Sequence, residues 1–314
     1  MYQHLQLLNR AKDLGVSIKD VSQLMQKNAA ILEKNGISEL VIDGVPTSWI
    51  NVRSQFYCDN KQLTKSAFEA LNIPHPKSMI FKEASEDGLS AFFQKGQVYV
   101  CKPLDGTNGV GVRLDISEFG DIRRYCEEFA NLETTYLIEE QIEGADLRIH
   151  AIGGKIVAAC IREPAYVLGN GKDTLEQLIK ERRAVMRTQN PNNFLEIDAS
   201  TEALLTKQKI GLSDKPANNQ KVQLKAIANM AQGAFAIDVT DDIHPVYEKW
   251  VADLSTYLNT GYFGLDCMTT DYTKHPAKHG YVLEVNARGD WLHHTFSERR
   301  THDMPSIILK ALFG

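Results

Sequence analysis

The chain has 314 residues, of which 43% are hydrophobic and 24% are charged, a composition typical of a protein with a substantial hydrophobic core. A formal net charge of −5 gives no electrostatic reason to expect binding to nucleic acid or to an anionic membrane surface. Five scattered cysteines without a CxxC pair, no secretory signal pattern and no apolar run of about 18 residues predict a cytoplasmic protein with reduced thiols.

The N-terminal residues predict a short α/β segment. Leucines at helical spacing predict a helix over 3–13, and a second helix is expected over 21–36, ending at Gly36. Residues 38–44 read as a strand followed by a turn. This segment is too small to form a large core of its own.

The rest of the chain mixes helices with strands that come mostly in hairpin-like pairs. The sequence predicts helices at 59–76 (closed by a proline-bounded loop), 85–96, 116–132, 174–188, 199–207, 246–261 and 305–314. Strands are expected at 77–81, 97–104, 112–116, 134–142, 263–271 and 280–289, with two more joined by the turn Gly153-Gly154. This pattern favours an α+β fold over a doubly wound parallel sheet.

The stretch YVCKPLDGTNGVGV, residues 99–112, carries a first candidate site. A predicted strand delivers Lys102 to a loop that contains Gly106, Gly109 and Gly111. Glycines let backbone N–H groups approach an anion closely, but the spacing matches neither the P-loop nor the dinucleotide motif. Two interpretations stay open: a flap over a triphosphate with Lys102 as a fixed charge, or a glycine-rich hairpin turn with an exposed lysine.

A second candidate site lies on two later strands. Asp266 ends one predicted strand, and Glu284 and Asn286 lie two apart on the next, which places both side chains on one face. Two carboxylates and an amide oxygen are hard ligands suited to Mg²⁺ shared with phosphate oxygens. The alternative is an edge strand with solvated polar residues. The apolar residues around and between the polar ones, including Val285, favour a mostly buried strand.

Acidic and histidine residues elsewhere are more ambiguous. Glu139, Glu140 and Glu143 leave an apolar run, where they repel one another unless donors such as an adenine amino group or ribose hydroxyls bind them. Taken alone, that segment is better explained as a solvated loop. His244 and the pair His293-His294 are best explained as loop histidines with local hydrogen bonds.

Taken together, these motifs resemble the ATP-grasp superfamily of carboxylate–amine ligases, most closely the ATP-grasp domain of cyanophycin synthetases and next the ligase module of bifunctional glutathione synthetases. The resemblance runs from about Asp59 to the C-terminus and includes DNKQLTK, VCKPLDGTNGVGV, LIEEQIEGADLRIH, FGLDCMTTD and EVNARG. It implies an ATP-grasp fold, with two α+β subdomains clasping ATP over 59–314 and a truncated N-terminal segment over 1–58.

The resemblance also implies roles for single residues. ATP phosphates would contact Lys61, Lys102 and the loop Gly106–Gly111; adenine would contact Glu139 and the backbone of Glu140 and Ile142; the ribose would contact Asp146. The metal ligands, for Mg²⁺ or Mn²⁺, would be Asp266, Glu284 and Asn286, and Arg148 and Arg162 would lie near the transferred phosphoryl group or a substrate carboxylate.

Departures from the family pattern lie mostly near the expected substrate site. Asn60 replaces a usual aspartate, Arg288 replaces a common proline beside the metal-ligand strand, and SERR follows the histidines. Arg288 is therefore expected to face the substrate. Because these changes lie near the expected substrate site, they leave the identity of the substrate open. They bear less on the expected binding of ATP.

The implied function is an ATP-dependent ligase that joins the carboxylate of an amino acid or small peptide to an amine through an acyl phosphate. The alternatives are a phosphotransferase acting on a small molecule at the same site, and a catalytically silent ATP-binding protein, against which Lys102, Asp266, Glu284 and Asn286 argue. The oligomeric state is left open, with a homodimer as one alternative.

Overall fold

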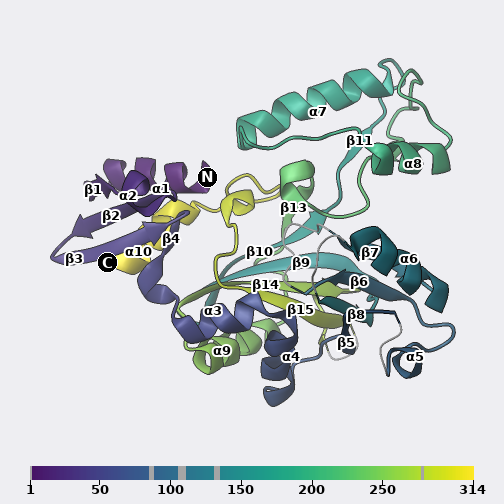
Figure 1. Cartoon of the computed structure of the whole chain (residues 1–314). Coiled ribbons are helices and arrows are strands. Elements are labelled where there is room, and N and C mark those ends of the chain that lie inside the picture. The colour runs from purple at the N-terminus through teal and green to yellow at the C-terminus, as the bar shows by residue number, and fades with distance from the viewer. Residues whose placement is uncertain (1, 85–87, 105–110, 131–134, 277–278) are drawn as a thin grey trace. The chain divides into compact units, whose positions relative to one another are not determined.

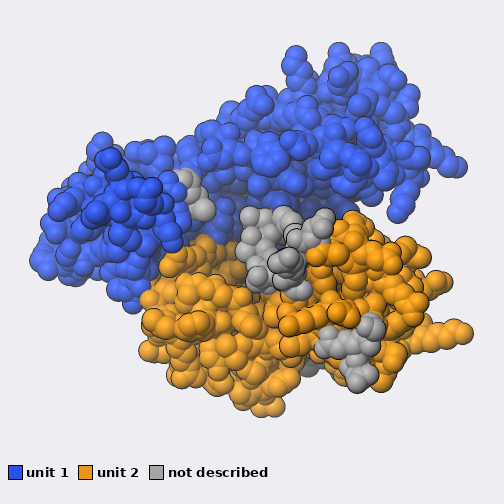
Figure 2. All heavy atoms as spheres, viewed as in Figure 1, with its two compact units in different colours: residues 1–48, 157–241, 290–314 blue, residues 49–156, 242–289 orange. Residues whose placement is uncertain are grey.

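The computed structural model describes residues 2–84, 88–104, 111–130, 135–276 and 279–314 (Figure 1). The chain forms two compact units, each assembled from separate stretches of sequence (Figure 2). Unit 1 comprises Met1–Ser48, Val157–Asp241 and Asp290–Gly314, and unit 2 comprises Trp49–Ile156 and Asp242–Gly289. Both units mix helices with antiparallel strands, which confirms the α+β prediction.

The N-terminal part of unit 1 is a four-stranded antiparallel sheet in the order β1-β2-β3-β4. Its strands are β1 (Ser17–Asp20), β2 (Ala29–Lys34), β3 (Ile37–Ile42) and β4 (Val45–Pro46). Helix α1 (Tyr2–Asp13) packs against the C-terminal helix α10 (Met304–Phe313), and the short α2 (Ser22–Met25) follows β1.

The helix predicted over 21–36 is wrong beyond the short α2, because Ala29–Lys34 forms β2, which pairs with β3 in a hairpin. Asn35 and Gly36 form its turn with φ of +52° and +78°. An Asn-Gly pair favours the left-handed turn of a two-residue hairpin, so Gly36 marks a turn between strands and does not end a helix.

The remainder of unit 1 centres on two pairs of strands. β10 (Lys155–Glu163), along which the chain passes from unit 2 into unit 1, pairs with β13 (Phe235–Asp238), and β11 (Tyr166–Leu168) pairs with β12 (Lys221–Gln223). Helices α7 (Leu175–Gln189) and α8 (Ala199–Lys207) confirm the two helices predicted there. They share a hydrophobic cluster with β11 and β12 that includes Leu175, Ile179, Leu205 and Val222.

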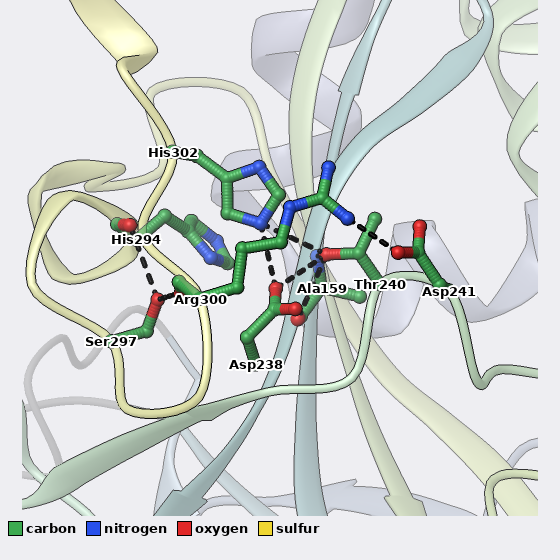
Figure 3. A network of polar contacts seen from close by, with 8 residues as sticks. All are labelled: Ala159, Asp238, Thr240, Asp241, His294, Ser297, Arg300 and His302. Atoms are coloured by element: carbon green, nitrogen blue, oxygen red, sulfur yellow. Dashed lines mark hydrogen bonds and ion pairs between the residues drawn. The ribbon is translucent and has the colours of Figure 1, made fainter.

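A buried polar network fixes the C-terminal segment to β13 within unit 1 (Figure 3). Nε2 of His302 lies 2.7 Å from Oδ1 of Asp238, and the Thr240 hydroxyl donates to the same carboxylate oxygen at 2.6 Å. At the edge of the network Arg300 pairs with Asp241 at 2.5 Å. His302, Asp238 and Thr240 thus supply one another's hydrogen-bond partners, as is usual for buried polar groups.

Unit 2 contains two antiparallel sheets. The first has the order β5-β8-β6-β7, with β5 (Ser78–Phe81), β6 (Tyr99–Pro103), β7 (Arg113–Ile116) and β8 (Tyr136–Glu140). Helices α5 (Leu89–Phe92) and α6 (Phe119–Phe129) share a core with it that includes Phe81, Tyr99, Ile122 and Tyr125.

The second sheet of unit 2 pairs β9 (Ala145–Ile152) with β14 (Tyr262–Thr269), and β14 with β15 (Gly280–Asn286). Helices α3 (Val52–Asp59) and α4 (Lys61–Ala70) contact β15, and α9 (Val246–Leu258) contacts α3. The single helix predicted over 59–76 begins instead at Lys61, because Asn60 caps α4 by accepting a hydrogen bond from the Leu63 N–H at 2.9 Å.

The cysteines form no disulfide: all five are free thiols. None of the helices in the described part of the chain has the length and apolar character that a membrane span requires.

Candidate active site

The predicted metal ligands converge within unit 2. The β14–β15 register places Asp266 directly opposite Glu284. Asn286 lies two residues further along β15, on the same face of the strand. Nδ2 of Asn286 donates to Oδ2 of Asp266 at 2.9 Å and to Oε1 of Glu284 at 3.3 Å. The three side chains therefore share one face of the sheet, as the spacing of two predicts.

Within this cluster, Glu284 has too little positive charge around it to balance its own carboxylate and that of Asp266. Burial raises the pKa of Glu284, the Asp266 carboxylate raises it further, and Lys102 and Lys61 only partly oppose both effects. Two carboxylates held this close favour a cation between them, and their hard oxygens suit Mg²⁺. The amide of Asn286 fits the same ligand set, since turning it by half a rotation presents its oxygen in place of its N–H₂ group.

Arg148 supports the metal-ligand face from the neighbouring strand. The β9–β14 register sets Arg148 opposite Asp266, and its Nη1 donates to Oδ1 of Asp266 at 2.6 Å. A Cβ at Gly264 would lie 2.8 Å from the guanidinium carbon, and one at Gly289 would lie 2.6 Å from Nη2. Both glycines thus leave the space that the buried guanidinium fills, and Arg148, Asp266 and Glu284 form one row across three strands.

The predicted phosphate-binding lysines also lie in unit 2. Lys102, on β6, forms an ion pair with Oε1 of Glu139 on the adjacent β8. Lys61, at the start of α4, donates to the carbonyl oxygen of Leu104 at 3.2 Å. Both lysines act electrostatically on Glu284, so the predicted phosphate-binding and metal-binding residues belong to one charged region.

Sequence reasoning missed Lys65, which lies one helical turn after Lys61. Its side chain is 2% exposed, and its Nζ lies 2.8 Å from Oε2 of Glu139 and donates to the carbonyl oxygen of Pro76 at 3.0 Å. A lysine three residues before Phe68, and so on the buried side of α4, is the signal that could have revealed it.

The remaining predicted site residues have different surroundings. Gly106 and Gly109 lie outside the described residues. Gly111 has a φ of +71°, and its carbonyl oxygen accepts from the Tyr125 hydroxyl at 2.8 Å. Oε2 of Glu140 accepts from the Lys77 N–H at 3.2 Å.

The last four predicted site residues lie on or near strands of the two units. Ile142 is half-buried in the connection from β8 to β9, and Asp146 lies on β9 opposite Met268. Arg288 is exposed just after β15. Arg162 lies on β10 in unit 1, opposite Ala236. Their contacts with ATP or substrate stay predictions, as does the adenine-binding role of Glu139, both of whose carboxylate oxygens bind lysines here.

Comparisons with known proteins relate the chain as a whole to synthetases and ligases. No protein-family model matches the chain. Cyanophycin synthetase from Crocosphaera subtropica is 31% identical to it over 267 residues, which cover 82% of this chain and 30% of that protein. The crystal structure of a bifunctional glutathione synthetase from Pasteurella multocida superimposes with a TM-score of 0.72 at 20% identity, covering 99% of this chain and 43% of that one. The ATP-grasp ligase PsnB has a TM-score of 0.50 at 14% identity, covering 84% of this chain and 62% of that one.

The chain thus shares its fold with the ATP-grasp ligase PsnB and with the bifunctional glutathione synthetase. The relatives found by sequence include cyanophycin synthetases and bifunctional glutathione synthetases. The chain spans only about 30% of the length of those cyanophycin synthetases.

Proposed function

We propose that this protein is an ATP- and Mg²⁺-dependent carboxylate–amine ligase, which forms an amide bond on an amino acid or small peptide. The observation that carries the proposal is the partly buried cluster of Asp266, Glu284 and Asn286 in the same charged region as Lys102 and Lys61. The similarity to synthetases and to an ATP-grasp ligase supports the same class of reaction. The expected cytoplasmic location is part of the proposal.

The chemistry requires positioning and charge neutralisation more than covalent participation by the protein. The γ-phosphoryl group moves from ATP to a carboxylate oxygen of the substrate and releases ADP. The amine then attacks the acyl carbon and expels inorganic phosphate. A bound Mg²⁺ would neutralise phosphate charge during the first step.

The chain's own residues divide this work. Asp266, Glu284 and Asn286 would hold the cation, and Arg148 fixes the orientation of Asp266 from β9. Lys102 and Lys61 would balance the negative charge of the phosphates. Arg162 and Arg288 are proposed to bind substrate carboxylate or oxyanion groups, for which a guanidinium provides two parallel donors.

The test is a screen of the purified chain with ATP and Mg²⁺ against single amino acids, amino-acid pairs and dipeptides. ADP release identifies the acceptor, and mass spectrometry identifies the product. We expect ADP release that needs an acceptor carboxylate, together with a product that has lost one water. A product heavier by one phosphoryl group would instead identify a phosphotransferase. The absence of ADP release with every acceptor in the screen would contradict the proposed activity.

A further inference from the structure

Lys65 and Glu139 form a buried charged contact that the ligase chemistry does not itself require. Lys65 lies on α4 and Glu139 on β8, and their side chains are 2% and 5% exposed. The second oxygen of Glu139 binds Lys102, whose side chain is 11% exposed. One carboxylate therefore lies between two ammonium groups, one fully enclosed and one nearer to solvent.

Burying a lysine this deeply is costly unless the charge is paired. Burial lowers the pKa of Lys65, and the attraction of Glu139 opposes this effect. Burial raises the pKa of Glu139, but the attraction of Lys102 and Lys65 together outweighs this effect and lowers it. The Lys65 ammonium also donates to the Pro76 carbonyl oxygen at 3.0 Å, so the structure holds it in place at two points.

The consequence concerns Lys102. Paired with Glu139 alone, its charge would be cancelled, and the pair would present little positive potential to a phosphate. With Lys65 on the other oxygen, the trio keeps one net positive charge. That charge is nearest to solvent at Lys102, which also acts on the metal-ligand carboxylate of Glu284.

Helix α4 links this trio to the other predicted phosphate ligand. Lys61 and Lys65 are four residues apart, which places them on one side of the helix. Lys61 donates to the Leu104 carbonyl oxygen just beyond β6, and Lys65 binds Glu139 on β8. The same helix face thus contacts β8 and the residue that follows β6, and both of these strands carry predicted ATP ligands.

We propose that Lys65 is a positioning residue for nucleotide binding: it offsets the charge of Glu139, so that Glu139 can orient Lys102 without cancelling its charge toward the phosphates. This inference rests on the proposed function.

Calorimetric titration with Mg²⁺ and the ATP analogue AMP-PNP tests this inference on the full chain. Lys65→Met should raise the Kd at least about tenfold, the scale of one charge-assisted hydrogen bond. The double variant Lys65→Met with Glu139→Gln removes both the compensating lysine and the carboxylate. It should bring the Kd back to within about threefold of the wild type, which a merely structural role for Lys65 does not predict. Lys95→Met removes an exposed lysine from the same unit and should leave the Kd unchanged.

An unchanged Kd in Lys65→Met, or a double variant weaker than the single one, would overturn the inference while leaving the ligase proposal intact. If Lys65→Met does not fold, the double variant decides alone: a Kd more than about tenfold above wild type contradicts the inference. A wild-type chain that does not bind the analogue at all contradicts the proposed function as well.

Discussion

At the scale of single residues, the buried and half-buried charges among the described residues of unit 2 include two groups. Arg148, Asp266 and Glu284 form a row across three strands, and Glu139 lies between two lysines. A buried charge is tolerated when an opposite charge lies beside it. Glu284 has a second carboxylate as its close neighbour instead, so a divalent cation would stabilise that point of the row most.

Glu284→Gln should lower the rate of ADP formation by about 10²-fold, the scale of a lost transition-state charge contact. Because burial and repulsion from Asp266 raise the pKa of Glu284, its ionised form disfavours the metal-free fold at neutral pH. The thermal midpoint of the metal-free variant should therefore be no lower than that of the wild type. Steady-state kinetics and thermal unfolding check both points, and near-normal turnover would remove Glu284 from the metal site.

Arg288→Ala should raise the KM for the carboxylate-bearing substrate more than tenfold, consistent with the loss of a charge-assisted pair of about 1.5–3 kcal/mol. The KM for ATP should barely change, because Arg288 is exposed beyond the end of β15 and is predicted to face the substrate. Kinetics with each substrate varied in turn separate the two constants. A rise in the KM for ATP instead would assign Arg288 to nucleotide binding.

The sequence predicted the local geometry of the candidate site. The spacing of Glu284 and Asn286 places both on one strand face, and the structure brings Asp266 to them. The sequence analysis missed Lys65, because its charge partner Glu139 lies 74 residues away along the chain. The Arg148–Asp266 contact, 118 residues apart, likewise depends on strand register that no local pattern specifies.

At the scale of elements, the segment of α7, α8, β11 and β12 has its own hydrophobic cluster and one strong charged contact. Lys225 is nearly buried, and its Nζ lies 2.6 Å from Oδ2 of Asp198. The other oxygen of Asp198 caps α8 by accepting from the Thr201 N–H at 2.9 Å. The beginning of α8 is thereby tied to the chain just after β12.

Asp198→Asn should lower the free energy of unfolding by about 1–2 kcal/mol at neutral pH, because asparagine keeps the cap but leaves Lys225 without its charge partner. Burial pushes the pKa of Asp198 up, but hydrogen bonds from Lys225, Ser200 and Thr201 outweigh this and hold it well below its usual range. The stabilisation is therefore present above the unfolded-state pKa of about 3.9 and is lost as the pH falls below it.

Chemical denaturation between pH 7 and pH 3 measures this effect. The difference between wild type and variant should shrink on acidification, and Glu181→Gln on the exposed side of α7 should show no comparable difference. A gap that stays constant with pH would mean that the Asp198 charge does not contribute.

Sequence patterns identified most elements of the fold, including α6, α7, α8, α9 and the paired strands β14 and β15. They failed over 21–36, where apolar residues that also fit a helix belong to a hairpin. The Asn35-Gly36 pair is the local signal for the hairpin turn. The apparent helical spacing of the residues before it points to a helix instead.

At the scale of the whole molecule, the chain enters each compact unit more than once. Unit 1 takes three segments and unit 2 takes two, with a crossing along β10. Such units depend on pairings between distant segments, and local sequence patterns carry little information about them. The division into 1–58 and 59–314 stays a prediction drawn from the extent of the family resemblance.

Mg²⁺ with AMP-PNP should raise the thermal midpoint of the whole chain. A ligand that binds only the folded state at 100 times its Kd adds about 2.7 kcal/mol to stability. Differential scanning calorimetry should show this increase with Mg²⁺ and should show most of it lost with excess EDTA. An increase of equal size without the metal would mean that Asp266, Glu284 and Asn286 do not act through a bound cation.

The central claim is that a substrate carboxylate is activated as an acyl phosphate. The direct measurement uses the acceptor identified in the screen, with both carboxylate oxygens replaced by ¹⁸O, and analyses the released phosphate by mass spectrometry. Transfer of the γ-phosphoryl group to a carboxylate oxygen, followed by attack of the amine, predicts one ¹⁸O in each inorganic phosphate and one in the amide product. Unlabelled phosphate accompanying amide formation would contradict the account.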